Sequence, residues 1–196
     1  MALKLEIPTI KRKEEAIQYI QEFYEYNSAI NGVGGLDRYL DDYEGWLEKL
    51  EQDYVRVPSE EKVPARTYFL VRTSDDRIIG MINIRLALNK KLREYGGNIG
   101  YSIRPTERRK GYNKVNLYLA LKVCQEYGIK EVLMDCDKDN PGSAKTIQAL
   151  GGELMREYFC EKDGCIVQDY KIDVDDSLVR YKEQYECNNK DFSDDF

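Results

Sequence analysis

The sequence predicts an α/β fold of the α+β kind, in which a mixed, mostly antiparallel central sheet carries helices on both faces. One strand pattern and two helical patterns precede a run of three strand patterns, and strands and helices then alternate before a final hairpin. Strands that follow one another directly pair antiparallel, whereas a strand–helix–strand crossover gives a parallel pair. With 42% hydrophobic residues, the 196-residue chain can bury a core of ordinary size.

The N-terminal third is predicted to hold one strand and two helices. Residues 3–7 alternate apolar and charged side chains, which is typical of a strand. Residues 13–27 repeat apolar side chains at helical spacing, and a second helical pattern begins at Asp37 after the turn-rich residues 31–35. Residues 56–65 carry two prolines and several charges, and we expect an exposed loop there.

The rest of the chain supplies most of the sheet and two more helices. Helical patterns lie at 110–127 and 144–150, and Gly128 is placed to end the first with a C-cap. Residues 1–175 are predicted to form a single domain. Residues 176–196 are acidic and polar and are predicted to be a tail, with a short helical segment near 178–185. The strand patterns are 67–73, 78–88, 98–103, 131–136, 153–160 and 165–174.

The composition excludes several classes of protein. The chain has no histidine, which removes histidine bases and most zinc sites, so we expect no metal. A net charge of −6 argues against nucleic-acid binding. No apolar run is long enough for a membrane helix, and the first residues lack the apolar core of a signal peptide. Five scattered cysteines without a Cys-x-x-Cys pair indicate free thiols, so we expect a cytoplasmic protein.

The most informative stretch runs from Gly96 to Asn113, where an apolar strand is followed by a tight basic loop and a helix start. The first amides of a helix have no intrahelical partner, and the helix dipole adds positive potential. Arg108, Arg109 and Lys110 add formal charge. The loop is therefore suited to a phosphate or a pyrophosphate, and a phosphorylated cofactor is the first hypothesis.

Two common phosphate loops do not match this stretch. A P-loop needs Gly-x-x-x-x-Gly-Lys-Ser/Thr, but Gly111 is followed by Tyr112, and no Ser or Thr follows to hold magnesium. A dinucleotide fingerprint needs Gly-x-Gly-x-x-Gly, but the glycines at 96, 97 and 100 are spaced differently and lie before or within the strand. Both readings are excluded.

The segment Arg108-Arg-Lys-Gly-Tyr-Asn113 resembles the coenzyme A signature Gln/Arg-x-x-Gly-x-Gly/Ala of the GNAT superfamily of N-acetyltransferases. The preceding residues 99–105 look like the central strand and the Arg-Pro turn of that family. Downstream, Asp139-Asn-Pro-Gly-Ser143 followed by Leu150-Gly151 is similar to its Asn-x-x-Ser segment and helix end. The two motifs agree in order and spacing over roughly residues 67–174. The resemblance is greatest to a bacterial branch of predicted acetyltransferases.

The resemblance implies transfer of an acetyl group from acetyl-CoA to an amine by direct attack. Amides of residues 109–114 would hold the pyrophosphate, and the open edge of the strand 99–103 would pair with the pantetheine arm. Asn140 would bond the pantetheine or order its loop. Lys145 would reach a phosphate or be an ordinary exposed lysine. The implied cofactor-binding residues are Ile99, Tyr101, Ile103, Arg108, Arg109, Lys110, Gly111, Tyr112, Asn113, Lys114, Asn140, Ser143 and Lys145.

One signature position departs from the family pattern. Asn113 stands where the family usually has Gly or Ala. Its side chain would either crowd the pyrophosphate or supply a hydrogen bond to it, and we expect cofactor binding to survive.

An amine must be neutral to attack, yet an alkylamine with a pKa of about 10.4 is protonated at neutral pH. Without histidine, a carboxylate is the natural base, and the candidates are Glu94, Asp135 and Asp137. The usual acidic tyrosine of the family is replaced by Ile147. The thiolate then leaves unprotonated or takes a proton from a substitute such as Tyr101, Tyr112 or Tyr158. Cys136 is expected to be a small buried hydrophobe rather than a nucleophile.

In this family the second helix usually walls the acceptor site. Residues 36–53 carry seven acidic side chains, with Tyr39, Tyr43 and Trp46 interleaved. This pattern indicates either an acidic, aromatic-lined mouth for a cationic amine or a solvated helix face whose aromatic residues pack inward. Polyamines, aminoglycoside-like compounds and basic peptides fit the first reading. A non-catalytic acyl-CoA-binding or sensing module is the alternative function, and exposed hairpin edges suggest a homodimer.

Overall fold

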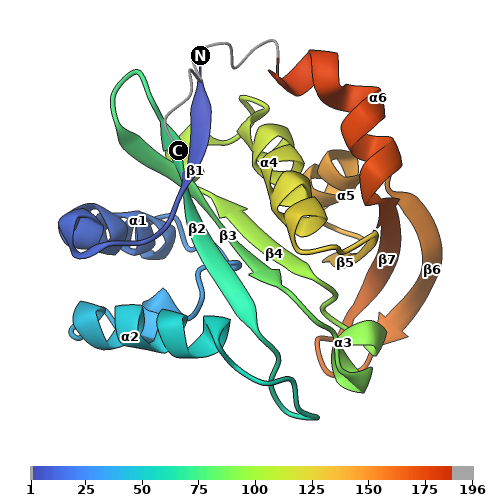
Figure 1. The fold of residues 1–196 in the computed structure, drawn as a ribbon, viewed down its shortest axis with the longest axis horizontal. Helices are drawn as coiled ribbons and strands as arrows, with labels where there is room; N and C mark the ends of the chain where they lie inside the picture. Colours follow the sequence, from blue (N-terminus) through green and yellow to red (C-terminus); the bar gives the residue numbers. More distant parts are fainter. Residues whose placement is uncertain (1, 187–196) are drawn as a thin grey trace.

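The computed structural model describes residues 2–186, in which seven strands form two antiparallel sheets (Figure 1). The first sheet has the order β1-β2-β3-β4, and its strands are β1 (Leu3–Glu6), β2 (Ala65–Arg72), β3 (Arg77–Arg85) and β4 (Ile99–Ile103). The second has the order β5-β7-β6, and its strands are β5 (Glu131–Asp137), β6 (Glu153–Cys160) and β7 (Cys165–Asp173). The fold is therefore the predicted mixed α/β architecture, with its antiparallel strands divided between two sheets.

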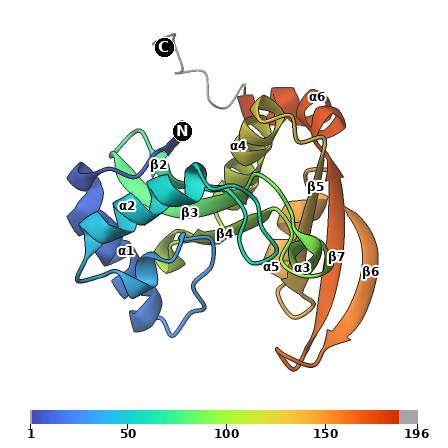
Figure 2. The same cartoon turned by 60° about the horizontal axis from the view of Figure 1, so that its bottom comes forward.

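Helices cover both sides of the sheets. Figure 2 shows α1 and α2 on one side of β2–β4, and α4 with α6 on the other. Within residues 2–186, no helix is long and apolar enough to cross a membrane. The helices are α1 (Lys13–Glu25), α2 (Tyr43–Tyr54), α3 (Lys90–Glu94), α4 (Tyr112–Glu126), α5 (Pro141–Gln148) and α6 (Val174–Glu186).

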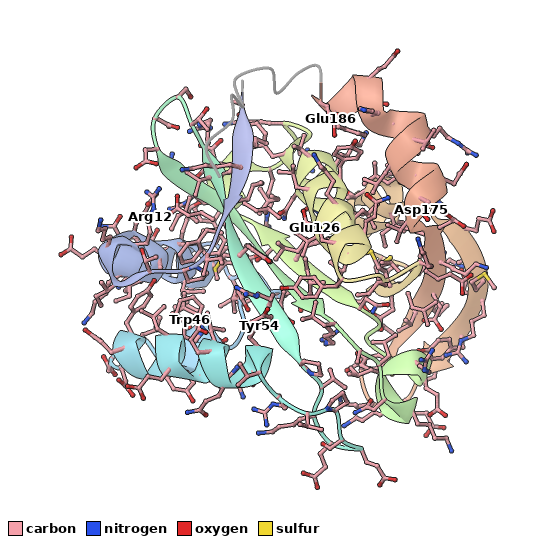
Figure 3. All side chains as sticks on the ribbon, in the orientation of Figure 1. Arg12, Trp46, Tyr54, Glu126, Asp175 and Glu186 are labelled. Carbon is pink, nitrogen blue, oxygen red and sulfur yellow. The ribbon has the colours of Figure 1, made fainter. Side chains whose placement is uncertain are left out.

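The first core lies between the helix pair α1–α2 and the first sheet. Phe23 of α1 and Trp46 of α2 are fully buried against Phe69 and Met81 of the strands (Figure 3). The Trp46 indole N–H donates to the Gly34 carbonyl at 3.1 Å, so its polar group is satisfied inside the core. The aromatic side chain of Trp46 therefore packs inward.

The second core lies under α4 and joins the two sheets. Leu117 and Leu121 of α4 pack in one cluster with Ile82 of β3, Val132 of β5 and Ile172 of β7. Fully burying a side chain of this size contributes about 1.5–3 kcal/mol. Because α4 contacts both sheets, it fixes the position of one against the other.

Two helices differ from the sequence prediction. The second helix begins at Tyr43 rather than Asp37, because Asp42 is its N-cap and accepts a hydrogen bond from Gly45 N at 3.0 Å. A short 3₁₀ turn, Leu36–Arg38, precedes it. The short helix α3 was not predicted, although Asn89 caps it by accepting from Leu92 N at 2.9 Å. The remaining helices and strands match their predicted positions within a few residues.

The structure also differs from the prediction at the end of the folded domain. Residues 176–186 lie in α6, where Tyr185 is buried and its ring centroid is 5.3 Å from that of Tyr118 in α4. The Ser177 hydroxyl donates to the Leu150 carbonyl at 2.8 Å. Residues 176–186 therefore belong to the folded core rather than to a polar tail, because one face of α6 is apolar. The rest of the predicted tail, residues 187–196, lies outside the described residues.

Candidate active site

Hydrogen bonds at Asn98, the residue before β4, join the two sheets. Its backbone N–H donates to the Leu133 carbonyl at 2.6 Å, and its side-chain oxygen accepts from Leu133 N at 2.9 Å. Gly97 must be glycine here, because its φ is +54° and an added Cβ would lie 2.1 Å from the Leu133 oxygen. Beyond this point β4 and β5 belong to separate sheets (Figures 1 and 2).

The divergence leaves one edge of β4 without a partner strand. Arg85 N donates to Asn98 O at 2.7 Å, and Arg104 N donates to Ile79 O at 2.9 Å, so the even-numbered residues of β4 bond β3. Alternation in an antiparallel strand then turns the backbone groups of residues 99, 101 and 103 away from β3. These are Ile99, Tyr101 and Ile103, the three strand residues predicted to pair with a pantetheine arm.

The loop between β4 and α4 leads into the N-terminus of that helix. Gly111 is the N-cap of α4 with φ +82°, and as a glycine it offers no side-chain acceptor to the amides of the first turn. A Cβ added at Gly111 would meet nothing within 4 Å, so protein atoms leave the space in front of the helix open. Lys114 N is bonded to Gly111 O at 3.1 Å. This geometry fits an anion at the N-terminus of α4.

Lys110, one of the three basic residues of this loop, is held by a buried carboxylate. Glu107 is almost fully buried and accepts from Lys110 Nζ at 2.8 Å, from Arg72 Nη1 at 2.9 Å and from Arg77 Nη1 at 3.1 Å. Burial alone would raise the pKa of Glu107, but the hydrogen bonds from Arg72 and Lys110 outweigh it and hold that pKa below its usual value. Lys110 therefore stabilises the loop as well as lending charge to it.

Two further arginines near the loop are bound to α1 and the residues after it. Arg104 Nη1 donates to Glu22 of α1 at 2.9 Å, and both the amide and the hydroxyl of Thr106 donate to the same carboxylate. Arg108 Nη2 donates to Ser28 Oγ at 2.7 Å. Within residues 2–186, Arg109 has no ion pair or side-chain hydrogen bond, and its φ is +62°. Of the predicted basic triplet, Arg109 is the member that remains for a ligand.

The N-terminus of α5 faces this loop across the gap between the sheets. Asn140 caps α5 by accepting from Ser143 N at 3.1 Å, so it orders its loop, which was one of its two predicted roles. The Ser143 hydroxyl lies 2.8 Å from the Tyr101 hydroxyl and so connects α5 to β4. Burial raises the pKa of Tyr101, although hydrogen bonds from Ser143 and Asn113 oppose the rise. Lys145 is exposed.

Asn113, the residue that departs from the signature, takes part in this connection. Its side-chain oxygen accepts from Asn116 Nδ2 at 3.3 Å, and its amide reaches the Tyr101 hydroxyl. Asn116 is fully buried, and its own oxygen has no hydrogen-bond partner among the described residues.

The three predicted base candidates lie in different environments. Glu94 is exposed at the end of α3, and Asp137 is exposed at the end of β5. Asp135 is half-buried, and its carboxylate accepts from Gly96 N at 2.8 Å. Burial raises the pKa of Asp135, with the facing Asp169 adding to the rise. Asp135 and Glu94 both line a cavity of about 240 Å³ between α3 and the second sheet.

The residues considered as the general acid also lie in different surroundings. Ile147 is fully buried in the core under α4, so the position of the family tyrosine serves packing here. The Tyr112 hydroxyl accepts from Arg72 at 3.3 Å, and the Tyr158 hydroxyl donates to the Glu94 carbonyl at 3.5 Å. Tyr101 is the candidate that lies between the sheets.

A larger cavity of about 700 Å³ lies beside α2, and we call it the basic cavity. It is bounded by α2, residues 56–65, β3 and α3. The predicted acidic, aromatic mouth is not found here: Tyr43 and Trp46 are buried in the core, and of the predicted residues only Tyr39 and Asp53 line the cavity. The charged lining residues are Arg38, Lys49, Asp53, Arg56, Glu61, Lys62, Arg85 and Lys91.

The reason for this difference lies in the orientation of α2. Its aromatic side chains face the sheet, and most of the intervening carboxylates therefore point to solvent, as Glu44 and Glu48 do. Lys49 lies on α2 and Arg38 just before it, whereas the other cations of the cavity come from residues 56–62, β3 and α3, segments that sequence order does not bring together.

Comparisons with known proteins agree with this fold. Residues 8–153 match the family model for an acetyltransferase (GNAT) domain. No curated protein sequence matches the chain. Among solved structures, the ribosomal-protein-S5-alanine acetyltransferase of Vibrio fischeri superposes with a TM-score of 0.65 at 14% identity, covering 90% of this chain and 95% of that one.

Two other solved structures have the same fold. The microcin C7 self-immunity acetyltransferase MccE, solved with acetyl-CoA and AMP, gives a TM-score of 0.64 at 18% identity and covers 88% of this chain and 92% of that one. A spermidine N-acetyltransferase chimera of Vibrio cholerae SpeG and hSSAT gives 0.61 at 14%, covering 91% and 99%. The family model thus defines an acetyltransferase of the acyl-CoA-dependent class. The chain belongs to the GNAT acetyltransferase family.

Proposed function

We propose that this protein transfers an acetyl group from acetyl-CoA to a primary amine by direct attack of the amine on the thioester. The observation that carries the proposal is the pairing of two features: the open space in front of the α4 N-cap, Gly111, and an edge of β4 that begins at Ile99 and has no partner strand among residues 2–186. The first suits a pyrophosphate, and the second suits a chain of amides that adds as a strand. Membership of the GNAT family supports the same assignment.

The cofactor-binding residues divide into three groups. The amides at the start of α4, with Arg109 and Lys114, would hold the pyrophosphate. The backbone of β4 at Ile99 and Tyr101 would bind the pantetheine arm. Acetyl-CoA, when bound, supplies the activated acetyl group. The unpaired Asn116 oxygen offers an acceptor in the same gap, beside Asn113.

Asp135 is the proposed general base. It alone of the three candidates is half-buried, and burial raises its pKa, which makes its carboxylate a better proton acceptor. Its side chain lies on the face of β5 opposite to Val132 and Met134, which point into the core under α4. It would take a proton from the ammonium form of the acceptor, directly or through one water, and so leave the neutral amine that attacks the thioester.

The second candidate function is a non-catalytic acyl-CoA-binding or sensing module. Ile147 favours it. This fully buried residue stands where the family has a tyrosine, and an isoleucine side chain has no proton to give to the leaving thiolate. Turnover separates the two functions: an enzyme releases free CoA from acetyl-CoA when an amine is present, and a sensor binds acetyl-CoA without releasing it.

A thermal-shift titration with acetyl-CoA, CoA and ATP tests the proposal, followed by measurement of free thiol. Ligand at a hundred times its dissociation constant stabilises the native state by about 2.7 kcal/mol. We expect a clear rise in melting temperature with both CoA species and a smaller one with ATP. Absence of any rise with either CoA species would contradict the proposal, and binding without thiol release would favour the sensor.

Two expectations about the cellular form stay predictions. The chain is expected in the cytoplasm and as a homodimer. β6 is the edge strand of the second sheet, and Leu154, Met155 and Phe159 on it are exposed, which suits contact between copies. Size-exclusion chromatography with light scattering measures the oligomeric state directly.

A further inference from the structure

The charge of the basic cavity is opposite to that of the whole chain. The protein has 36 acidic and 30 basic residues and a net charge of −6. The cavity, in contrast, is lined by six cationic and two acidic side chains. A concave surface lined by one sign of charge concentrates its field and raises the local concentration of ions of the opposite sign. The cavity is therefore suited to anions, although the protein as a whole repels them.

The two carboxylates leave much of this positive charge unpaired. Asp53 accepts from both Lys49 and Arg56, the latter at 2.7 Å, and so neutralises at most one of the two cations. Glu61 is exposed and forms no ion pair among residues 2–186. The Nε of Arg56 is buried without a hydrogen-bond partner in that same part of the chain.

Three rim cations come from three separate segments. Arg38 ends the 3₁₀ turn before α2, Lys62 lies in the loop 56–65, and Lys91 lies in α3. None of the three has an ion-pair partner in the described part of the chain, residues 2–186. Their convergence on one hollow therefore differs from a solvated stripe along a single helix.

The basic cavity borders the smaller cavity that contains the proposed base. Leu92 lines both cavities, and Asp135 lines the smaller one. Arg85 lines the basic cavity, and its Nη1 donates to the carbonyls of Gly96 at 2.7 Å and Gly97 at 2.8 Å, two residues that line the smaller cavity. The Gly96 amide, in turn, donates to Asp135 at 2.8 Å. A molecule long enough to span the two cavities would hold its anionic group in the basic one and its amine in the one that Asp135 lines.

We propose that the acceptor is a primary amine that also carries a carboxylate or a phosphate, and that the basic cavity binds this anionic group. The inference rests on the proposed acetyl transfer and names its substrate class. Arg38, Arg56 and Arg85 offer the planar donor pairs that match carboxylate and phosphate oxygens. A polyamine would meet six cationic side chains and is a poor acceptor on the same grounds.

The binding test uses protein saturated with CoA, so that the loop at α4 is filled, and titrates it by calorimetry with inorganic pyrophosphate and with spermidine. We expect pyrophosphate to bind more tightly than spermidine. The double variant Arg38→Gln/Lys91→Gln should weaken pyrophosphate binding about tenfold, as expected for two lost charge-assisted contacts. The control Lys11→Gln/Lys182→Gln removes the same charge from exposed positions outside the cavity lining and should change binding less than about twofold.

The kinetic test compares matched acceptors at fixed acetyl-CoA: O-phosphoethanolamine with ethanolamine, and γ-aminobutyrate with n-butylamine. We expect the anionic member of each pair to have the higher kcat/KM, by about tenfold, and the double variant to remove this advantage. Tighter binding of spermidine, faster neutral amines or an unchanged double variant would overturn the inference. If none of these amines is acetylated, the binding test decides. Failure of CoA itself to bind would instead overturn the proposed function.

Discussion

Two basic regions of this protein use their charges in different ways. At the loop before α4, Lys110 is bound to the buried Glu107. In the basic cavity beside α2, Lys62 and Lys91 have no ion pair among residues 2–186. The loop presents the basic sequence motif, yet much of its charge holds the fold together. The residues of the cavity form no sequence motif, yet their charged side chains line a hollow that a ligand can enter.

The buried carboxylate explains why the loop is rigid. A buried ion pair contributes little net stability, but removing one partner leaves an uncompensated charge inside the protein. Glu107 bonds three cations, from β2, β3 and the loop, and therefore fixes the loop against the sheet. The backbone amides at Gly111 are then held in position before a ligand arrives, which reduces the entropy lost on binding.

Asp135 is the proposed base of the reaction, so Asp135→Asn is expected to have the largest effect. It should lower kcat/KM by about 10²–10⁴-fold while leaving acetyl-CoA affinity unchanged. Burial raises the pKa of Asp135, so kcat/KM should rise with pH around a pKa higher than the usual value of about 3.9 for an aspartate. The variant should lose this pH-dependent rise. Asp137→Asn, at an exposed position two residues on, is the control. Equal rates for both variants would remove Asp135 as base.

Glu107→Gln tests whether the loop cations are structural. We expect a loss of about 3 kcal/mol in the free energy of unfolding, measured in urea, because Arg72, Arg77 and Lys110 would lose the buried carboxylate that they share, although Arg72 keeps its ion pair with Asp75. Glu126→Gln, at the exposed end of α4 (Figure 3), should be nearly neutral. The lowered pKa of Glu107 adds a pH dependence: its stabilisation is present above about 4.3 and is lost as pH falls through the folded-state pKa. If Glu107→Gln were stable and bound CoA more tightly, the cations released from Glu107 would be ligand-binding groups rather than structural ones.

Gly111→Ala and Gly128→Ala separate the cost of backbone strain from the cost to the ligand. Both glycines lie at the ends of α4 with positive φ, and a Cβ meets nothing within 4 Å at either. Each variant should lose about 1–2 kcal/mol of stability. Only Gly111→Ala should also weaken acetyl-CoA binding, about tenfold, because its Cβ would enter the space before the α4 amides. Parallel losses of affinity in both variants would place the cofactor elsewhere.

Asn113→Gly restores the family signature and is expected to have the smallest effect. The Asn113 side chain is bonded to Asn116 and Tyr101, so its removal should change the dissociation constant of CoA by less than about threefold. Fluorescence or calorimetric titration measures this directly. A large gain in affinity would show that Asn113 obstructs the loop.

Local signals allowed part of this structure to be predicted from sequence. The helix start at Gly111, the cap at Asn140 and the hairpin of β6 and β7 each depend on residues only a few positions apart. The fold class followed from the order of such segments.

Long-range contacts were not predictable in the same way. Arg104 meets Glu22 across 82 residues, and nothing in a single sequence pairs them. The basic cavity gathers residues from Gly34 to Leu92, so its charge differs from that of any one segment within it. The aromatic residues of α2 were compatible with two predictions, a wall of the acceptor site and a face packed into the core. Only their packing against the sheet distinguishes the two.

The two hydrogen bonds of Asn98 to Leu133 also have a mechanical consequence. They lie where β4 begins, whereas the N-termini of α4 and α5 follow the far ends of β4 and β5. If one sheet rotates slightly against the other, Asn98 is the pivot and moves least. The ends that carry Gly111 and Asn140 move most. Thermal breathing would thus widen the cofactor entrance while leaving Asp135, two residues from the pivot pair, nearly still.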